Sequence, residues 1–233
     1  MSFAVRIPEV LPFLIGVLVL FGILAVGFHL IRRRRTAVVC CLLGLVGAGY
    51  MLYFFRDPPR HPPSDPNVVV AGADGVIMGI KEVQEPQFLS NRTVRISIFL
   101  SLFDVHVNRA PLAGRVTSLG YYPGRRFFTF QEKSSEENQH SAIVIEGSRT
   151  RCLVKQIVGP VARRVVYWLE PGQQLALGER IGMMKFGSRL DLYLPADDVD
   201  VSAKVGDRVR AGETVVATLR APVSDVPAEG SVP

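Results

Sequence analysis

The sequence contains few of the residues that build disulfide or metal frameworks. Of its 233 residues, three are cysteine and four are histidine. Cys40 and Cys41 lie side by side in an apolar run, and Cys152 stands alone in a β-like segment. This arrangement is neither a disulfide framework nor a zinc site, and no two histidines have the spacing of metal ligands. We therefore expect no bound metal.

Little net charge remains once the first 55 residues are set aside. The formal net charge is +6, but residues 1–55 contain five of the 27 Lys and Arg residues and one of the 21 Asp and Glu residues, which leaves 22 basic and 20 acidic groups. A nearly neutral domain gives no electrostatic support for nucleic-acid binding. The basic charge is instead concentrated in RRRR (32–35), where anionic lipid headgroups attract each arginine by roughly 1 kcal/mol.

Two long apolar runs occupy the N-terminal part of the chain. Residues 11–31 are apolar apart from His29, and residues 36–55 carry no charged side chain. Each run has about the 20 residues that a helix needs to cross a bilayer. The four arginines between them leave room only for a tight turn, so residues 1–55 predict a membrane-associated hydrophobic helical hairpin. A cleaved signal peptide is disfavoured, because a second apolar run follows and no A-x-A site is present.

The rest of the chain has the pattern of a β domain behind a stiff linker. The segment FRDPPRHPPSDP (55–66) contains five prolines, which forbid a continuing helix and favour extended chain. Residues 56–66 are therefore the expected linker. From residue 67 to 225, short β-branched runs alternate with Gly and Pro turns. This pattern predicts a mainly β domain.

An internal repeat refines the expected architecture. GQQLALGERI (172–181) matches GDRVRAGETV (206–215) with an offset of 34 residues. Its glycines mark turns in which a positive φ is tolerated, and duplicated units of this kind build small closed barrels of the biotinyl or lipoyl type. We expect a small barrel-like β domain with biotinyl/lipoyl-like repeated half-units, preceded by the helical hairpin. The analogy supports a fold rather than a function.

A glycine–serine pair, Gly187-Ser188, separates two runs that both favour strands. Taken alone, the pair is most simply a turn or a bulge. A catalytic role needs a base, because a neutral serine hydroxyl is a weak nucleophile. His106, in the strand-like DVHVNRAP, is the best candidate, since His140 lies in a polar loop. Asp74, in the GADG turn, is a candidate to orient that histidine as in a catalytic triad, although an Asp-Gly turn is usually only a turn.

Four motifs taken together carry a family resemblance. They occur in the order ADG (73–75), FDVHVNRAP (103–111), KQIVGPVARR (155–164) and FGSRLDLYLP (186–195), behind an apolar N-terminus that ends in YFFRDP. The ordered set closely resembles phosphatidylserine decarboxylase, in the short, membrane-associated form of the proenzyme, over nearly all of residues 50–220. The Gly-Ser pair alone would be weak evidence, but the ordered set is specific.

The resemblance implies that the Gly187–Ser188 bond is a site of self-cleavage. The Ser188 hydroxyl would attack the Gly187 carbonyl and convert the peptide bond into an ester, which β-elimination then breaks. Residues 1–187 would become the β chain and residues 188–233 the α chain, capped by a pyruvoyl group formed from Ser188 with loss of ammonia. Glycine before the serine allows the strained backbone that this attack requires. The two chains would remain associated as a heterodimer or within a higher oligomer.

The resemblance also implies the reaction, a pyruvoyl-dependent decarboxylation of phosphatidylserine to phosphatidylethanolamine and CO2. The pyruvoyl ketone would form a Schiff base with the substrate amine and accept the electrons that the departing CO2 leaves behind, without an external cofactor or metal. It assigns Asp74 and His106 to activation of Ser188, and His106 also to proton transfer during decarboxylation.

One position departs from the family pattern. The longer bacterial members carry a second histidine three residues after the first, where this chain has Arg109. It is therefore open whether His106 serves both self-cleavage and decarboxylation. Arg109 is a candidate to bind the substrate phosphate or carboxylate, or else an exposed arginine at the end of a strand.

The expected location is the cell membrane, because the implied substrate is a membrane lipid. The positive-inside rule places residues 32–35 in the cytoplasm, so a hairpin with two full spans would put the β domain outside. The family resemblance implies the cytoplasmic face. A hairpin that enters only one leaflet, or a segment that lies at the interface, would reconcile the two.

Two alternatives remain open from the sequence. GMMKFGS resembles the lysine-bearing turn of biotin or lipoyl carrier domains, which would make Lys185 an attachment site in a membrane-anchored carrier or adaptor module. That interpretation leaves Ser188, His106 and Asp74 without a purpose. The closer alternative keeps the mechanism and changes the lipid, since an archaeal ether lipid would make the enzyme an archaetidylserine decarboxylase.

Overall fold

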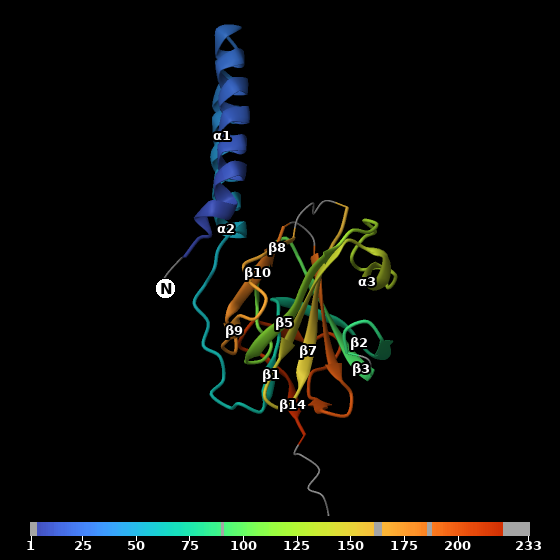
Figure 1. Cartoon of the computed structure of the whole chain (residues 1–233). Helices are drawn as coiled ribbons and strands as arrows, with labels where there is room; N and C mark the ends of the chain where they lie inside the picture. Colours follow the sequence, from blue (N-terminus) through green and yellow to red (C-terminus); the bar gives the residue numbers. More distant parts are fainter. Residues whose placement is uncertain (1–3, 90, 161–164, 186–187, 221–233) are drawn as a thin grey trace, which may run out of the picture.

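The structure is a computed structural model that describes residues 4–89, 91–160, 165–185 and 188–220 (Figure 1). A pair of N-terminal helices stands on one end of a β domain, so the predicted fold class is confirmed. The helices are α1 (Ile7–Leu30), α2 (Arg34–Phe54) and the short α3 (Ser134–Glu137). The strands are β1 (Val68–Val70), β2 (Gly75–Glu85), β3 (Asn91–Leu100), β4 (Val107–Arg109), β5 (Gly114–Tyr122), β6 (His140–Glu146), β7 (Arg151–Val158), β8 (Val165–Tyr167), β9 (Gln174–Leu175), β10 (Arg180–Met184), β11 (Ser188–Pro195), β12 (Val199–Val201), β13 (Arg208–Val209) and β14 (Val215–Leu219).

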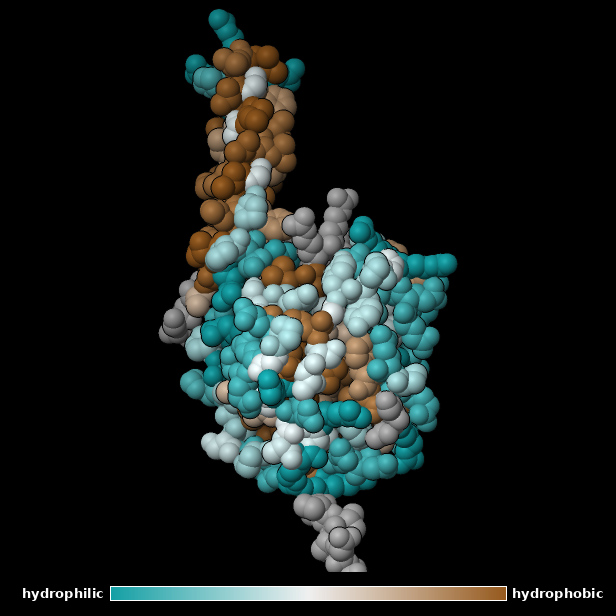
Figure 2. Space-filling model, in the orientation of Figure 1, coloured by the Kyte–Doolittle hydropathy of each residue, from teal (hydrophilic) through white to brown (hydrophobic). Residues whose placement is uncertain are grey.

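The helices α1 and α2 form a hairpin whose outer surface is apolar (Figure 2). Arg32, with a φ of 57°, lies in the turn between them. Gly44 lets the helices approach closely, because a Cβ there would lie 2.9 Å from the Cβ of Phe21. Both helices are long and apolar enough to cross a membrane. Helices that expose apolar side chains all round are expected where lipid rather than water surrounds them.

The β domain is built around an eight-stranded antiparallel sheet in the order β13-β2-β3-β11-β7-β6-β5-β9. Two three-stranded sheets, β1-β14-β12 and β4-β10-β8, complete the domain. Strand β11 lies inside the large sheet between β3 and β7, and all eight of its residues are buried. Two of them, Arg189 and Asp191, are charged. Buried charges need partners within the protein, so this strand combines apolar packing with a polar cluster.

The sequence repeat corresponds to two matching turn-and-strand units. The repeated glycines all have positive φ, with values of 86° at Gly172, 71° at Gly178, 98° at Gly206 and 76° at Gly212. Strands β9 and β10 follow the turns of the first copy as β13 and β14 follow those of the second, and β9 and β13 form opposite edges of the large sheet. The copies meet where a Cβ on Gly212 would lie 3.2 Å from the Cα of Gly178. The predicted half-units are confirmed.

The linker between α2 and β1 is bound along the β domain by ion pairs (Figure 1). Asp57 contacts Arg109 (Oδ1 to Nη2, 3.0 Å) and Arg180 (Oδ2 to Nε, 2.5 Å). Arg60 contacts Asp74 (Nη2 to Oδ2, 2.7 Å). Removing one partner of a buried pair is strongly destabilising, because it leaves an uncompensated charge. These contacts therefore fix the base of the helical hairpin relative to the β domain.

Candidate active site

Ser188 is the first residue of β11 and has neighbours on both sides. It lies opposite Leu100 of β3 and Val158 of β7. Its side chain is fully buried, and its Oγ has no hydrogen-bond partner among the described residues. Leaving a buried hydroxyl unpaired costs about 1–3 kcal/mol, a cost that no hydrogen bond to a described residue offsets. Gly187, the other half of the predicted cleavage site, lies outside the described residues.

His106 lies between β3 and β4, where Asp104 shapes the backbone. The Asp104 carboxylate accepts hydrogen bonds from the backbone N–H and the hydroxyl of Ser101 (2.8 and 2.6 Å). The Asp104 carbonyl contacts His106 Nδ1 (3.0 Å). Because a carbonyl can only accept, Nδ1 carries the proton and Nε2 carries the lone pair in the neutral ring. In the described part of the chain this buried Nε2 has no partner, so it is available as a base.

The surroundings of His106 keep its ring neutral. The side chain is fully buried, and its ring centroid lies 4.2 Å from that of Phe54 at the end of α2. The pKa of His106 is lowered from 6.5 to about 4, chiefly by burial and also by the charge of Arg56, while Asp104 acts in the opposite direction. Burial has this effect because it disfavours the charged imidazolium. At neutral pH the ring is therefore unprotonated, as a general base must be.

Backbone pairing brings Ser188 and His106 to one end of the fold. Ser188 lies opposite Leu100, and only a short loop separates Leu100 from His106. The backbone N–H of Met184, shortly before Ser188, donates to the His106 carbonyl (3.2 Å). These two backbone contacts place Ser188 and His106 at the same end of the fold, although the two residues are far apart in the sequence. The structure brings these two predicted residues into one region without a hydrogen bond between their side chains.

Asn108 is a third buried side chain with an unpartnered atom, and the sequence analysis did not identify it. Its Oδ1 accepts a hydrogen bond from Gln156 Nε2 (2.7 Å), and Gln156 Oε1 accepts one from the Ser141 hydroxyl (2.7 Å). Gly182 makes room for this arrangement, because a Cβ there would lie 3.1 Å from Gln156 Nε2. Within the described ranges, Asn108 Nδ2 has no acceptor. The network therefore holds the amide in place and leaves one donor group unused.

Gln156 also relates Asn108 to Ser188. It pairs with Leu190 across β7 and β11, which makes it a diagonal neighbour of Ser188 on the same face of the sheet, roughly 7–8 Å away. A serine hydroxyl, a neutral imidazole and an amide donor are thus held in one buried region. This combination can support attack of the hydroxyl on a carbonyl, with the imidazole taking the proton and the amide stabilising the oxyanion.

The family model and the relatives that match this chain all have the same described activity. Residues 48–217 match the family described as phosphatidylserine decarboxylase. The phosphatidylserine decarboxylase proenzyme of Desulfotalea psychrophila is 38% identical over 203 residues, which cover 85% of this chain and 94% of the relative. That of Symbiobacterium thermophilum is 41% identical over 210 residues (89% and 93%), and that of Pelobacter propionicus is 46% identical over 171 residues (73% and 77%). The chain belongs to the phosphatidylserine decarboxylase family.

The resemblance predicted from the four ordered motifs is therefore confirmed. As a member of this family the chain is a decarboxylase of phosphatidylserine, a lyase of phospholipid biosynthesis. The relatives are named proenzymes, which makes the chain a zymogen that is processed to its active form.

In this decarboxylase Asp74 binds the linker and has no hydrogen bond to His106. Its Oδ2 accepts from Arg60 (2.7 Å), and its Oδ1 accepts from the backbone N–H of Ala211 (2.8 Å). Burial raises the pKa of Asp74, while Arg60 acts to lower it. The atom that orients the His106 ring is the carbonyl of Asp104. The role predicted for Asp74 in activating Ser188 stays a prediction.

Arg109 is buried in the decarboxylase and also binds the linker. Its Nη2 contacts Asp57 Oδ1 (3.0 Å) and the Pro58 carbonyl (3.1 Å), and its Nη1 donates to the Gly178 carbonyl (3.0 Å). Burial lowers its pKa, and the charge of Asp57 opposes this effect. The alternative of an exposed arginine is wrong, because the side chain is 7% exposed. Its predicted role in substrate binding stays a prediction, and it would require the guanidinium to exchange these contacts.

Lys185, the attachment site in the carrier interpretation, is largely buried against the base of α1. Its Nζ binds Glu9 Oε2 (2.6 Å) and lies 5.6 Å from the ring centroid of Phe13 and 5.8 Å from that of Phe55. A carrier lysine must be accessible to the enzyme that modifies it. This geometry disfavours the carrier interpretation.

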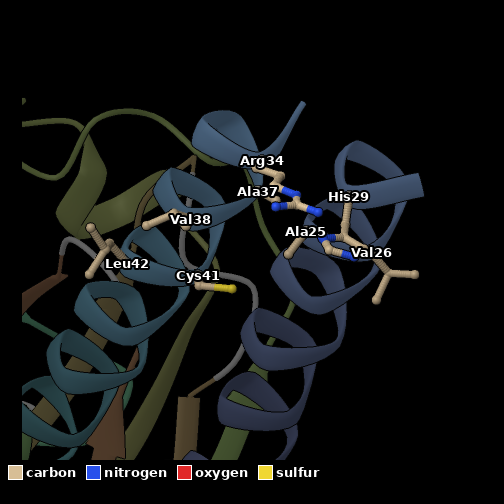
Figure 3. Close-up of a pocket in the computed structure, with 8 residues that line it drawn as sticks. All are labelled: Ala25, Val26, His29, Arg34, Ala37, Val38, Cys41 and Leu42. Atoms are coloured by element: carbon tan, nitrogen blue, oxygen red, sulfur yellow. The ribbon is translucent and has the colours of Figure 1, made fainter. Parts of the chain in front are cut away.

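A groove in the helical hairpin lies apart from the catalytic candidates, near the turn between α1 and α2 (Figure 3). Its volume is about 590 Å³, and it is lined by Ala25, Val26, His29, Arg34, Ala37, Val38, Cys41 and Leu42. Apart from His29 and Arg34, which approach each other in Figure 3, the lining is small or apolar. Such a surface suits contact with lipid chains rather than decarboxylation chemistry.

Proposed function

We propose that this decarboxylase is a self-processing, pyruvoyl-dependent enzyme, which cleaves its own Gly187–Ser188 bond and then removes the carboxyl group of phosphatidylserine as CO2. The observation that best supports the proposal is that three of the seven unpartnered buried side-chain atoms in the described residues are Ser188 Oγ, His106 Nε2 and Asn108 Nδ2. Each carries a desolvation cost that no hydrogen bond among the described residues offsets. Their chemistry matches a nucleophile, a base and an oxyanion donor.

Self-cleavage begins at the Ser188 hydroxyl. Its proton passes to His106 Nε2 while Oγ bonds to the Gly187 carbonyl carbon, and the Asn108 amide donates to the developing oxyanion. The C–N bond then breaks, and the freed Ser188 amine takes the proton, which leaves an ester between Gly187 and the Ser188 side chain. Loss of the Ser188 α-proton expels the Gly187 carboxylate by β-elimination. The resulting dehydroalanine takes up water and releases ammonia, which leaves a pyruvoyl group at position 188.

The residues around position 188 fit such a group. The backbone of β11 would hold it between β3 and β7, close to the neutral His106 ring and the free Asn108 donor. Once formed, a pyruvoyl group supplies a ketone that takes up the substrate amine and an electron sink for the pair released with CO2. His106 can hold and return a proton at Nε2, and Asn108 can donate to a substrate oxygen. The burial of both side chains limits the access of water to the site.

The β and α chains would stay together after cleavage. Strand β11 pairs with eight residues of β3 and six of β7. After a cut before Ser188, β11 would belong to the α chain, and both of its neighbours would belong to the β chain. The proposed product is therefore a tightly associated heterodimer.

The helical hairpin supports a location at the membrane, and we extend the proposal to the cytoplasmic face of the cell membrane. The helices contain 24 and 21 residues, and at about 1.5 Å per residue each can reach across the roughly 30 Å hydrocarbon core. Two full spans would carry residues 32–35 to the far side, against the positive-inside rule. A hairpin that lies tilted within one leaflet avoids this conflict. Protease digestion of sealed vesicles of known orientation tests which side carries the β domain.

The deciding experiment is intact mass measurement of the purified wild-type chain under denaturing conditions, with Ser188→Ala as the control. We expect two fragments divided between Gly187 and Ser188, the smaller one lighter by one ammonia than hydrolysis alone would give. The Ser188→Ala chain should remain whole at its full mass and should not decarboxylate phosphatidylserine. A wild-type chain that stays at 25.6 kDa while it decarboxylates phosphatidylserine would falsify the proposed mechanism. Extra mass on Lys185 would favour the carrier interpretation.

A further inference from the structure

Two short loops of the β domain expose large apolar side chains to solvent. Leu102 and Phe103, between β3 and β4, are 45% and 69% exposed. Phe128 and Phe130, between β5 and α3, are 55% and 60% exposed. Single exposed hydrophobic residues need no explanation, whereas contiguous exposed apolar patches mark protein or membrane interaction sites. We call these two pairs the first and the second apolar loop.

The first apolar loop is attached to the end of α2 through its backbone. The hydroxyls of Tyr50 and Tyr53 donate to the carbonyls of Leu102 (3.2 Å) and Phe103 (3.1 Å). Arg56 Nη2 also donates to the Phe103 carbonyl (2.7 Å). These contacts use carbonyl oxygens only, so they fix the loop and leave both apolar side chains exposed at the base of the helical hairpin.

The second apolar loop is held by Asn138. The Asn138 side chain accepts from the backbone N–H of Phe127 (2.9 Å) and donates to the Phe127 carbonyl (2.7 Å). It also donates to the carbonyl of Val158 (2.9 Å). The rings of Phe128 and Phe130 stack on each other with their centroids 5.4 Å apart. The loop is thus ordered, and its two exposed rings present one continuous apolar surface.

The two apolar loops flank Ser188. On one side, the first loop directly follows Leu100, the β3 residue opposite Ser188. On the other side, Asn138 ties the second loop to Val158, the β7 residue opposite Ser188. Figure 1 shows α3, which follows the second loop, at the same end of the β domain as the base of α2, and away from β1 and β14. The loops and the helical hairpin therefore share one end of the molecule.

We propose that the two apolar loops form a membrane-docking surface, which inserts into the headgroup region of an anionic, phosphatidylserine-containing leaflet and holds the end of β11 against it. The proposal rests on the proposed function, since it explains how the headgroup of a lipid reaches a buried Ser188. Aromatic side chains are favoured at the membrane interface. The exposed Arg125 and Arg126, immediately before the second loop, can contact lipid phosphates.

Continuity with the helical hairpin favours a membrane over a protein partner. The first apolar loop hydrogen-bonds to the last turns of α2, so a bilayer that surrounds α2 also reaches Leu102 and Phe103. A protein that covered this surface would have to displace the lipid around the hairpin and would close the path to Ser188. A lipid surface can cover the apolar loops without displacing the lipid around the hairpin. It also delivers the substrate.

The first test compares the decarboxylation of phosphatidylserine in two physical forms. One form is vesicles of four parts phosphatidylcholine to one part phosphatidylserine, and the other is a short-chain phosphatidylserine below its micelle concentration. For the double variant Phe128→Ser/Phe130→Ser we expect the ratio of vesicle to short-chain activity to fall about tenfold, which corresponds to roughly 1.4 kcal/mol. Val205→Ser is the matched control, because Val205 is 62% exposed but belongs to neither loop. Its ratio should equal that of the wild type.

The outcomes separate this proposal from the proposed function. A correctly cleaved double variant that keeps the wild-type ratio overturns the docking surface and leaves the pyruvoyl mechanism standing. Failure of the wild type to decarboxylate either form contradicts the proposed function instead.

A second measurement does not depend on activity. Phe130→Trp should gain fluorescence that brominated lipids quench, whereas Val205→Trp should gain fluorescence that they do not quench. Equal quenching of the two added tryptophans overturns the docking surface, even where the serine variants lose activity on both substrates.

Discussion

Two groups of buried polar residues lie on opposite faces of the large sheet at β11, and they differ in their hydrogen bonding. In the first group, Arg189 Nε contacts Asp191 Oδ1 (2.6 Å), Arg189 Nη2 donates to Ser97 Oγ (2.8 Å), and Ser135 Oγ donates to Asp191 Oδ2 (2.7 Å). Both oxygens of the carboxylate and the guanidinium group have partners. This cluster joins β3, β11 and α3, and its hydrogen bonds explain why these charged residues are buried.

The second group comprises Ser188, His106 and Asn108, and each of these side chains keeps one buried atom without a partner. Ser188 and Arg189 are adjacent in β11, so their side chains point to opposite faces of the large sheet. Buried polar groups are nearly always paired, and the exceptions need a reason. The first group thus stabilises the sheet, whereas Ser188, His106 and Asn108 keep the atoms that the proposed chemistry would use. Two substitutions and a change of pH test this distinction.

The largest effect on stability is expected at Asp191. Replacing Asp191 with Asn leaves the Arg189 guanidinium buried without a counter-charge, which should cost about 3–5 kcal/mol of unfolding free energy. Asp200→Asn is the matched control, because Asp200 pairs with Arg220 (2.8 Å) but is 65% exposed, and its loss should cost less than about 0.5 kcal/mol. Thermal unfolding in detergent measures both. Equal melting temperatures for the two variants would contradict the assignment of the first group to structure.

A smaller effect, on rate rather than stability, is expected at Asn108. Asn108→Asp keeps the Oδ1 acceptor for Gln156 but removes the Nδ2 donor. Loss of one oxyanion donor typically slows a reaction by about 10²–10³-fold, so cleavage of newly synthesised chain, followed by gel electrophoresis, should slow by roughly this factor. Ser141→Ala is the control, since it removes the outer hydrogen bond of the same network and keeps the donor. If Ser141→Ala slows cleavage as much as Asn108→Asp does, the amide serves the network and not the reaction.

The smallest effect is expected from pH. The pKa of His106 is lowered from 6.5 to about 4, so Nε2 stays unprotonated as the pH falls from 8 to 5, and the cleavage rate should change by less than about twofold over this range. Below pH 4 the rate should fall about tenfold per unit. A rate that halves near pH 6.5 would show an ordinary histidine and would remove the physical distinction between the two groups.

The lowered pKa of His106 also makes the free energy of unfolding depend on pH in a defined direction. Because the folded chain binds the His106 proton less readily than the unfolded chain, His106 contributes its full stability above pH 6.5. That contribution is lost as the pH falls from 6.5 towards 4.

Local patterns were sufficient to predict the helical hairpin, the β class and the repeat. Long apolar runs identify helices in lipid, and glycines such as Gly178 and Gly212 are conspicuous where a turn needs positive φ. Ser188 and His106 could be selected as candidates from their motifs. These features depend on residues close together in the sequence, which is why a single chain reveals them.

The contacts of the candidate site could not be predicted in the same way. Asp74 was expected to orient His106, but its hydrogen bonds are with Arg60 and Ala211, and the Asp104 carbonyl contacts the ring instead. No periodicity encodes a backbone carbonyl as an orienting group. Asn108 was missed because its significance depends on Gln156, which reaches it only after β4 and β7 are folded together.

The place of β11 inside the large sheet has a consequence for how the enzyme can be made. A strand at the edge of a sheet can be supplied by a separate peptide, because one row of hydrogen-bonding groups is free. β11 has a neighbouring strand on each side, so a separate α fragment could join the sheet only if β3 and β7 first separated. A gene divided at the codon for Ser188 should therefore yield fragments that fail to complement each other. The proposed cut before Ser188 would therefore have to follow the folding of a single polypeptide.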